Sequence, residues 1–220
     1  VSPLLAGDDA RPTALASVST VGSEPLDPAV LLGKQIFYDG HAMSQDGYIS
    51  CASCHLGGDH DGRTWDFTNR GEGLRNTTDL RGRAGTAHGP VHWSGNFDEI
   101  QDFENDMRLH FGGPGLLDDA DFEAAMDPLG EPKAGLSERL DALAAYVSSL
   151  DSFPRSPFKT PEGEFTAEAL EGQALFETSG CQDCHSGERL TDSAVDVRHD
   201  VGTITAESEV LQYDPANRAY

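Results

Sequence analysis

CASCH at residues 51–55 and CQDCH at residues 181–185 are two copies of one five-residue pattern, and together they contain all four cysteines of the 220-residue chain. The pattern C-x-x-C-H is the attachment signature of c-type haem. Two thiols at this spacing bond to the vinyl groups at one edge of the porphyrin, and the adjoining histidine reaches the iron. We therefore predict two covalently attached haems. The predicted attachment residues are Cys51, Cys54, Cys181 and Cys184, and the predicted proximal iron ligands are His55 and His185.

Other uses of paired cysteines explain the pattern less well. A zinc site could combine both C-x-x-C pairs, but the pairs lie about 130 residues apart, and an all-cysteine zinc site needs no adjoining histidine. A thioredoxin-like redox pair would lie in a βαβ unit, and structural disulfides rarely bridge C-x-x-C. Covalent haem is therefore the favoured interpretation.

The composition and the haem motifs indicate which classes of partner and which cellular compartment to expect. The chain has 15 Lys and Arg against 38 Asp and Glu, which gives a net charge of −23 at pH 7. Because this charge repels phosphates and anionic lipids, we expect no nucleic-acid partner. No apolar run approaches the ~18–20 residues that span a bilayer, so we expect no membrane span. Thioether attachment of haem takes place outside the cytoplasm, so we predict a periplasmic or extracellular protein. The sequence starts at Val1 without a leader, so a secretion signal, if one existed, has been removed or left out.

Three stretches have helical signals. Asp27-Pro28 is an N-cap followed by proline at the first helical position, and the helical pattern continues to residues 39–40. A second helix is predicted from Thr166 to residues 179–180, and the clearest one covers residues 137–150, where apolar residues recur at i, i+3, i+4 spacing. Residues 97–108 are a further helical candidate. No strand ladder is expected, and the Gly-, Arg-, Thr- and Asn-rich stretch before Phe97 predicts a long loop around a cofactor.

The chain contains a divergent internal repeat. GKQIF at residues 33–37 matches GQALF at residues 172–176, a shared G-x-x-[aliphatic]-F before each haem motif. A glycine inside a helix costs roughly 1 kcal/mol relative to alanine. Glycines at matching places therefore predict a close packing contact at both positions.

These signals predict a mainly α fold with two cytochrome c-like haem domains and long loops. The predicted parts are an extended N-terminal arm (residues 1–24), a first haem domain (25–151), a Pro-rich linker (152–160) and a second haem domain (161–220). The second domain is predicted to be incomplete, because nothing after its haem motif resembles the helix at residues 137–150.

The order of these motifs resembles the dihaem cytochrome c peroxidase superfamily, which includes the methylamine-utilisation dihaem oxidases. The matching stretches are LGKQIFYD (32–39), ISCASCH (49–55), RNT (75–77), WSG (93–95), LTD (190–192) and HDVG (199–202). The resemblance covers most of residues 26–203 and implies the helical cytochrome c fold. The family pattern R-N-x-P-T reads RNTTD at residues 75–79, so the family's interdomain calcium ligand transfers only weakly to Asn76. The chain also stops before the segment that supplies the family's second distal ligand.

The sixth iron ligand separates the possible functions, because two strong ligands suit electron transfer and an open face lets peroxide bind. The resemblance places His92 near the first haem, and His92 is the favoured distal ligand there. For the second haem, His199 is either the distal ligand or a hydrogen-bonding residue at the haem edge. The alternatives to His92 are His88, His60, Met107 and His110.

Arginines are concentrated at residues 70, 75, 81 and 83 of this otherwise acidic chain. Each haem carries two propionates, and an arginine binds a carboxylate through two parallel hydrogen bonds. We therefore predict that Arg75 and Arg81 bind haem. Trp93 is predicted to line the haem crevice, with core packing as the alternative.

Two functions follow from these residues. The favoured one is a dihaem c-type cytochrome that carries electrons between its haems, without an assigned catalytic residue. The alternative is a cytochrome c peroxidase-like enzyme that reduces hydrogen peroxide, with Glu99 or Glu104 as its acid–base group.

The expected partner is a redox protein or further copies of the same chain. If the chain is not a fragment, the arm of another copy is expected to cover the incomplete second domain. Such a head-to-tail contact need not close, so it could continue into a filament.

Overall fold

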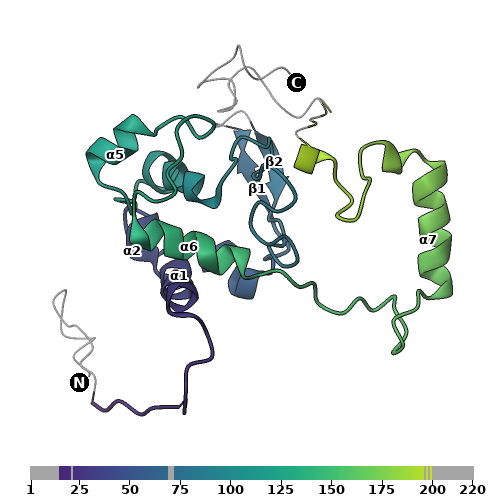
Figure 1. The fold of residues 1–220 in the computed structure, drawn as a ribbon, viewed down its shortest axis with the longest axis horizontal. Helices are drawn as coiled ribbons and strands as arrows, with labels where there is room; N and C mark the ends of the chain where they lie inside the picture. The colour runs from purple at the N-terminus through teal and green to yellow at the C-terminus, as the bar shows by residue number, and fades with distance from the viewer. Residues whose placement is uncertain (1–14, 21, 69–71, 196, 198, 200–220) are drawn as a thin grey trace.

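A computed structural model of the chain describes residues 15–20, 22–68, 72–195, 197 and 199 (Figure 1). Within these residues the fold is mainly helical, as predicted, with one small hairpin. Its helices and strands are α1 (Pro28–Tyr38), α2 (Gly40–Met43), α3 (Cys51–Cys54), β1 (Thr64–Phe67), β2 (Gly73–Asn76), α4 (Phe103–Asn105), α5 (Asp119–Ala124), α6 (Glu138–Ser148) and α7 (Ala167–Thr178). Arg70, most of the predicted arm and residues 200–220 lie outside the described residues.

The three helices predicted from sequence are confirmed as α1, α6 and α7. Each begins after a side chain that accepts a hydrogen bond from the first turn, which satisfies a backbone N–H that has no partner within the helix. Asp27 accepts from the Ala29 N–H at 2.9 Å. Ser137 and Thr166 do the same at the starts of α6 and α7.

The core of the described fold lies where α1 packs against α6. Gly33 allows the close approach, because a Cβ built at this position would lie 1.8 Å from the carbonyl oxygen of Ala142. One turn further along, the ring of Phe37 meets the edge of Tyr146 with centroids 5.1 Å apart. Phe37 is fully buried, and burying such a side chain contributes about 1.5–3 kcal/mol. The predicted close contact is thus confirmed at Gly33.

The expectation of no strand ladder was wrong for residues 64–76. β1 and β2 pair antiparallel, with Thr64 opposite Asn76 and Phe67 opposite Gly73. The indole of Trp93 packs on the hairpin, 4.7 Å from the Phe67 ring, and donates a hydrogen bond to the carbonyl of Asn76 at 3.1 Å. β1 alternates polar and apolar residues (TWDF), but each strand has only 4 residues, and a residue outside the hairpin supplies this contact.

Residues 97–108 are helical but irregular. A 3₁₀ turn over Ile100–Asp102 leads into α4, and a π-helix follows over Asp106–His110. Single turns of π-helix are rare and occur frequently at functional sites.

The segment around the second motif differs from the first in its packing. Figure 1 shows α7 apart from α1 and α6, and none of its residues is buried. Leu170 and Leu175 are more than half exposed. A Cβ at Gly172 would meet nothing within 4 Å, so the expected close contact was wrong at this glycine. Among the described residues, no helix packs against α7 in the way that α6 packs against α1.

Candidate haem sites

The two C-x-x-C-H motifs adopt the same backbone turn. The N–H of His55 donates to the carbonyl of Cys51 at 2.9 Å, and the N–H of His185 donates to the carbonyl of Cys181 at the same distance. α3 forms the first turn and a 3₁₀ turn over Cys181–Asp183 forms the second. None of the four cysteines is in a disulfide. Each motif therefore presents two thiols one helical turn apart, followed directly by a histidine.

The ring of His185 is held in an orientation that suits an iron ligand. Its Nδ1 lies 3.2 Å from the carbonyl oxygen of Leu190, which can only accept a hydrogen bond. Leu190 has a φ of 53°, in the left-handed region. A histidine that donates from Nδ1 to a carbonyl has its Nε2 lone pair available for a metal, which is the usual arrangement for ligating histidines.

An open pocket of about 710 Å³ lies beside His185. Its lining includes Phe165, Gly172, Phe176 and Leu190. The volume falls within the range of about 300–1,000 Å³ that is typical of small-molecule and cofactor sites. The apolar side chains around α7 and the predicted iron ligand therefore border one space, and these residues fit a haem.

His55 and Cys51 of the first motif are less exposed to solvent than His185 and Cys181 of the second. The Nδ1 atom of His55 is buried and has no hydrogen-bond partner among the described residues. Burial lowers the pKa of His55, which keeps the ring neutral, and neutral imidazole is the form that binds metals. Burial also raises the pKa of the Cys51 thiol to about 12, so this thiol stays protonated. A neutral histidine next to two cysteines one helical turn apart fits a covalent haem, whose iron takes the histidine nitrogen.

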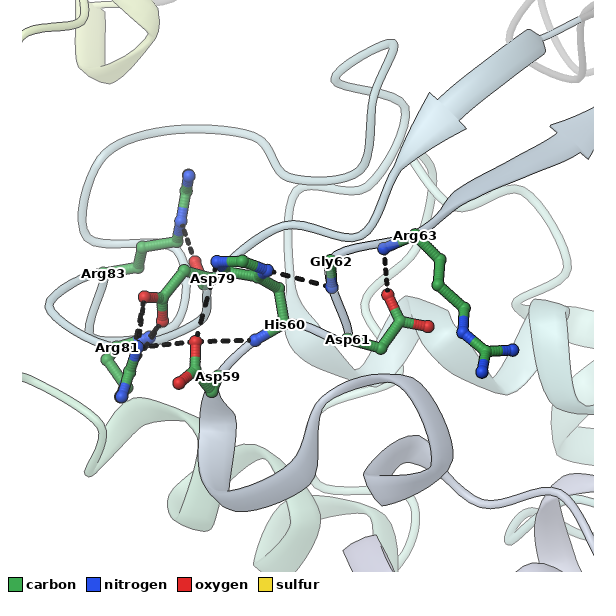
Figure 2. Close-up of polar contacts among 8 residues, drawn as sticks. All are labelled: Asp59, His60, Asp61, Gly62, Arg63, Asp79, Arg81 and Arg83. Carbon is green, nitrogen blue, oxygen red and sulfur yellow. Dashed lines mark hydrogen bonds and ion pairs between the residues drawn. The ribbon is translucent and has the colours of Figure 1, made fainter.

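A cluster of charged residues, Asp59, Asp79 and Arg81, lies next to the first motif (Figure 2). The guanidinium of Arg81 pairs with Asp59 at 2.6 Å and with Asp79 at 2.7 Å. The hydrogen bonds from Arg81 lower the pKa of Asp79. The structure thus places Arg81 next to the loop after His55, where two carboxylates already neutralise it.

His60 lies next to this charged cluster, and its Nδ1 accepts a hydrogen bond from the Gly62 N–H at 3.1 Å (Figure 2). The proton of the neutral ring must then be on Nε2. In this conformation neither ring nitrogen has a lone pair available for iron.

His92, the favoured distal ligand, is almost fully buried at the foot of the hairpin. Its φ of 70° is in the left-handed region, which is uncommon for a residue other than glycine and costs about 1–3 kcal/mol. The ring stacks on Phe97 at 4.7 Å, and its Nδ1 lies 2.9 Å from Oδ1 of Asn96. These contacts fix the ring and direct its Nε2 toward Asp106, 3.7 Å away.

Asp106 is a site residue that the sequence reasoning missed. It is buried in the π-helix and lies near enough to Cys51 to raise the pKa of that thiol. The signal was present as an acidic residue inside a helical candidate, but only the fold brings it to His92. The carboxylates considered beforehand have structural partners instead: Glu104 accepts hydrogen bonds from the backbone of Leu116 and Leu117, and Glu99 accepts from the backbone of Lys133.

The other predicted residues are placed as follows. Arg75 pairs with the buried Glu72 at 3.0 Å. Trp93 packs between the hairpin and His92, whose ring is 4.4 Å away.

The remaining candidate iron ligands are placed as follows. Met107 is buried in the core and His110 is exposed. His199 bonds through Nε2 to Asp192 at 2.8 Å. Haem binding by Arg75, Arg81 and Trp93 and iron ligation by His92 and His199 stay predictions.

Two searches of the described residues had no result. No group of three or more His, Cys, Asp and Glu side chains there could hold a metal ion by itself. No described helix has the length and apolar character needed to cross a membrane.

Comparison with known proteins bears out the family resemblance. Residues 27–108 match a family model described as di-haem cytochrome c peroxidase. This stretch includes the first haem motif, the hairpin, His92 and Asp106. The chain is also 32% identical over 180 residues to hydrazine synthase subunit gamma of Kuenenia stuttgartiensis. That match covers 77% of this chain and 47% of the other protein, so the chain spans about half the length of this curated relative.

Proposed function

We propose, from the match of residues 27–108 to the di-haem cytochrome c peroxidase family, that this chain is a dihaem c-type cytochrome that carries electrons between two covalent haems. The observation that carries the proposal is the shared turn of the two motifs, in which each histidine N–H donates to the carbonyl of the first cysteine. When bound, haem iron supplies one-electron redox chemistry. The chain supplies the thioether cysteines, the proximal histidines and the groups that orient them.

Electron transfer is favoured over catalysis because of how the distal candidates are held. His92 is buried and oriented by Asn96 and Phe97, as expected for a permanent iron ligand. The two carboxylates expected to serve a peroxide site, Glu99 and Glu104, are occupied by backbone N–H groups.

A peroxidase-like reaction is the second candidate, and Asp106 favours it. Its carboxylate lies 3.7 Å from Nε2 of His92, so the pair could accept and return a proton beside the first haem. In this case His92 does not bind the iron, and that haem keeps an open face. The family whose model matches residues 27–108 bears the name of such an enzyme.

We also propose that the chain works as part of a larger assembly outside the cytoplasm. The similar protein from Kuenenia stuttgartiensis is named as a subunit. The second motif is surrounded by exposed apolar side chains, among them Phe165, Leu175 and Leu190. A redox protein with a basic surface would complement the net charge of −23, and further copies of the chain are the other partner class. The filament stays a prediction.

The spin state of the ferric haems tests the choice between the two functions. We expect two low-spin haems by electron paramagnetic resonance and visible spectroscopy of the isolated protein, and no rapid turnover of hydrogen peroxide. A resting high-spin haem together with rapid peroxide turnover would overturn the electron-transfer assignment in favour of the peroxidase.

A further inference from the structure

The segment after the second motif touches the first haem region at one place. Nη1 of Arg189 donates to the carbonyl of Gly82 at 3.4 Å, across 107 residues of sequence. Nearby, a Cβ at Gly89 would lie 2.4 Å from the backbone of Ser193. Residues 82–89 and 189–193 therefore form a seam between the two haem regions.

Two arginines and one histidine meet at this seam. Nη1 of Arg83 donates to Nε2 of His88 at 3.0 Å. The charges of Arg83 and Arg189 both act on His88 and, together with burial as the larger cause, lower its pKa. Because Nε2 accepts the hydrogen bond from Arg83, the proton of the His88 ring is on Nδ1.

The cluster contains donors without a matching acceptor. Elsewhere in the chain the guanidinium groups of Arg75, Arg81 and Arg108 each pair with a carboxylate. Among the described residues, neither Arg83 nor Arg189 forms an ion pair; Arg83 donates to the backbone carbonyl of Asp79 and to His88. Nδ1 of His88 is buried and has no hydrogen-bond partner in the described structure.

We propose that Arg83, His88 and Arg189 bind a haem propionate at this seam. The inference rests on the proposed dihaem function. A propionate is an anionic acceptor of the type that the cluster lacks, and guanidinium groups bind carboxylates with charge-assisted hydrogen bonds.

The position of the seam suits both haem regions. Arg83 is bonded to the backbone of Asp79, whose charge acts on His55. Arg189 precedes Leu190, whose carbonyl bonds to His185. The cluster thus lies between the loops that hold the two predicted proximal ligands, and one carboxylate bound here would join both haem regions.

The test measures the midpoint potential of each haem in Arg83→Gln and Arg189→Gln. A positive charge near a haem favours the reduced state, so its removal lowers the potential. We expect both variants to lower the potential of the same haem. We also expect its pH dependence to move to higher pH, because a propionate without cationic partners has a higher pKa. Arg155→Gln is the matched control, since it removes one charge from an exposed position in the linker.

The outcomes separate this inference from the proposed function. Two haems attached by mass, with neither variant shifting a potential more than Arg155→Gln does, would overturn the propionate site and leave the cytochrome intact. Shifts in different haems would also overturn a single shared site. A chain without covalent haem would overturn the proposed function itself.

Discussion

Gly33 in α1 lies directly against the carbonyl of Ala142 in α6, whereas its repeat counterpart Gly172 in α7 faces open space. The two glycines occupy matching positions in the sequence repeat and different positions in the packing. A helix lies against the first, and none of the described helices lies against the second. This difference supports the interpretation that the second haem region is completed by something beyond the described residues.

Alanine substitutions at these two glycines should have opposite effects. Gly33→Ala places a methyl group in contact with the backbone of α6, so we expect the free energy of unfolding to fall by about 1–3 kcal/mol or more. Gly172→Ala meets no atom and gains helix propensity, so we expect a rise of up to about 1 kcal/mol. Thermal unfolding of the haem-loaded variants checks both. Equal losses at the two positions would mean that Gly172 is also packed.

Replacing Asp79 should change the acid sensitivity of the protein. Its pKa is lowered by Arg81, so the carboxylate stabilises the fold above its unfolded pKa of about 3.8, and this contribution is lost as the pH falls through the folded pKa. We expect Asp79→Asn to lower the free energy of unfolding by about 1 kcal/mol at most at pH 7, because the pair is partly exposed. The difference from the parent protein should shrink as the pH falls below about 3.8. A difference that grows on acidification would contradict this assignment.

The hydrogen bond from His185 to Leu190 should set the potential of the second haem. Leu190→Pro fixes φ near −65° and moves the carbonyl away from Nδ1. Because this hydrogen bond makes the ligand more basic and favours ferric iron, we expect its loss to raise the potential of that haem. Leu190→Gly removes the same apolar side chain from the cavity lining but keeps the left-handed backbone, so it should shift the potential less than Leu190→Pro does. Potentiometric titration of both variants would contradict the assignment if the glycine variant shifts as much as the proline variant.

His92→Ala should convert one ferric haem to a high-spin or water-bound form. The ring is buried and fixed by Asn96 and Phe97, and alanine cannot replace its nitrogen. His41→Ala is the control, because the ring of His41 is exposed and pairs with Asp39, and it should leave both spin states unchanged. Electron paramagnetic resonance of the two variants decides. Two low-spin haems in His92→Ala would exclude His92 as a ligand.

Local signals in the sequence were sufficient for some elements. The N-caps Asp27, Ser137 and Thr166 lie at the starts of the helices, as expected, because capping depends only on neighbouring residues. The C-x-x-C-H turns could likewise be predicted from the sequence, because each is closed by a backbone hydrogen bond between the first and last residue of the motif.

Other features depend on residues far apart in sequence. The hairpin packs against Trp93, 17 residues beyond Asn76, and its two strands of 4 residues each are too short to be recognised from the sequence alone. Asp106 reaches His92 only through an irregular helix, and Arg189 reaches Gly82 across 107 residues. Such contacts are set by packing and leave no spacing rule in the sequence.

The mass of the denatured chain tests the central assignment most directly, because thioether bonds survive denaturation and ligand bonds do not. We predict the mass of the polypeptide plus two haems, with no free thiol at Cys51, Cys54, Cys181 or Cys184. A chain with one haem, or a chain of unmodified mass with four free thiols and bound zinc, would contradict it.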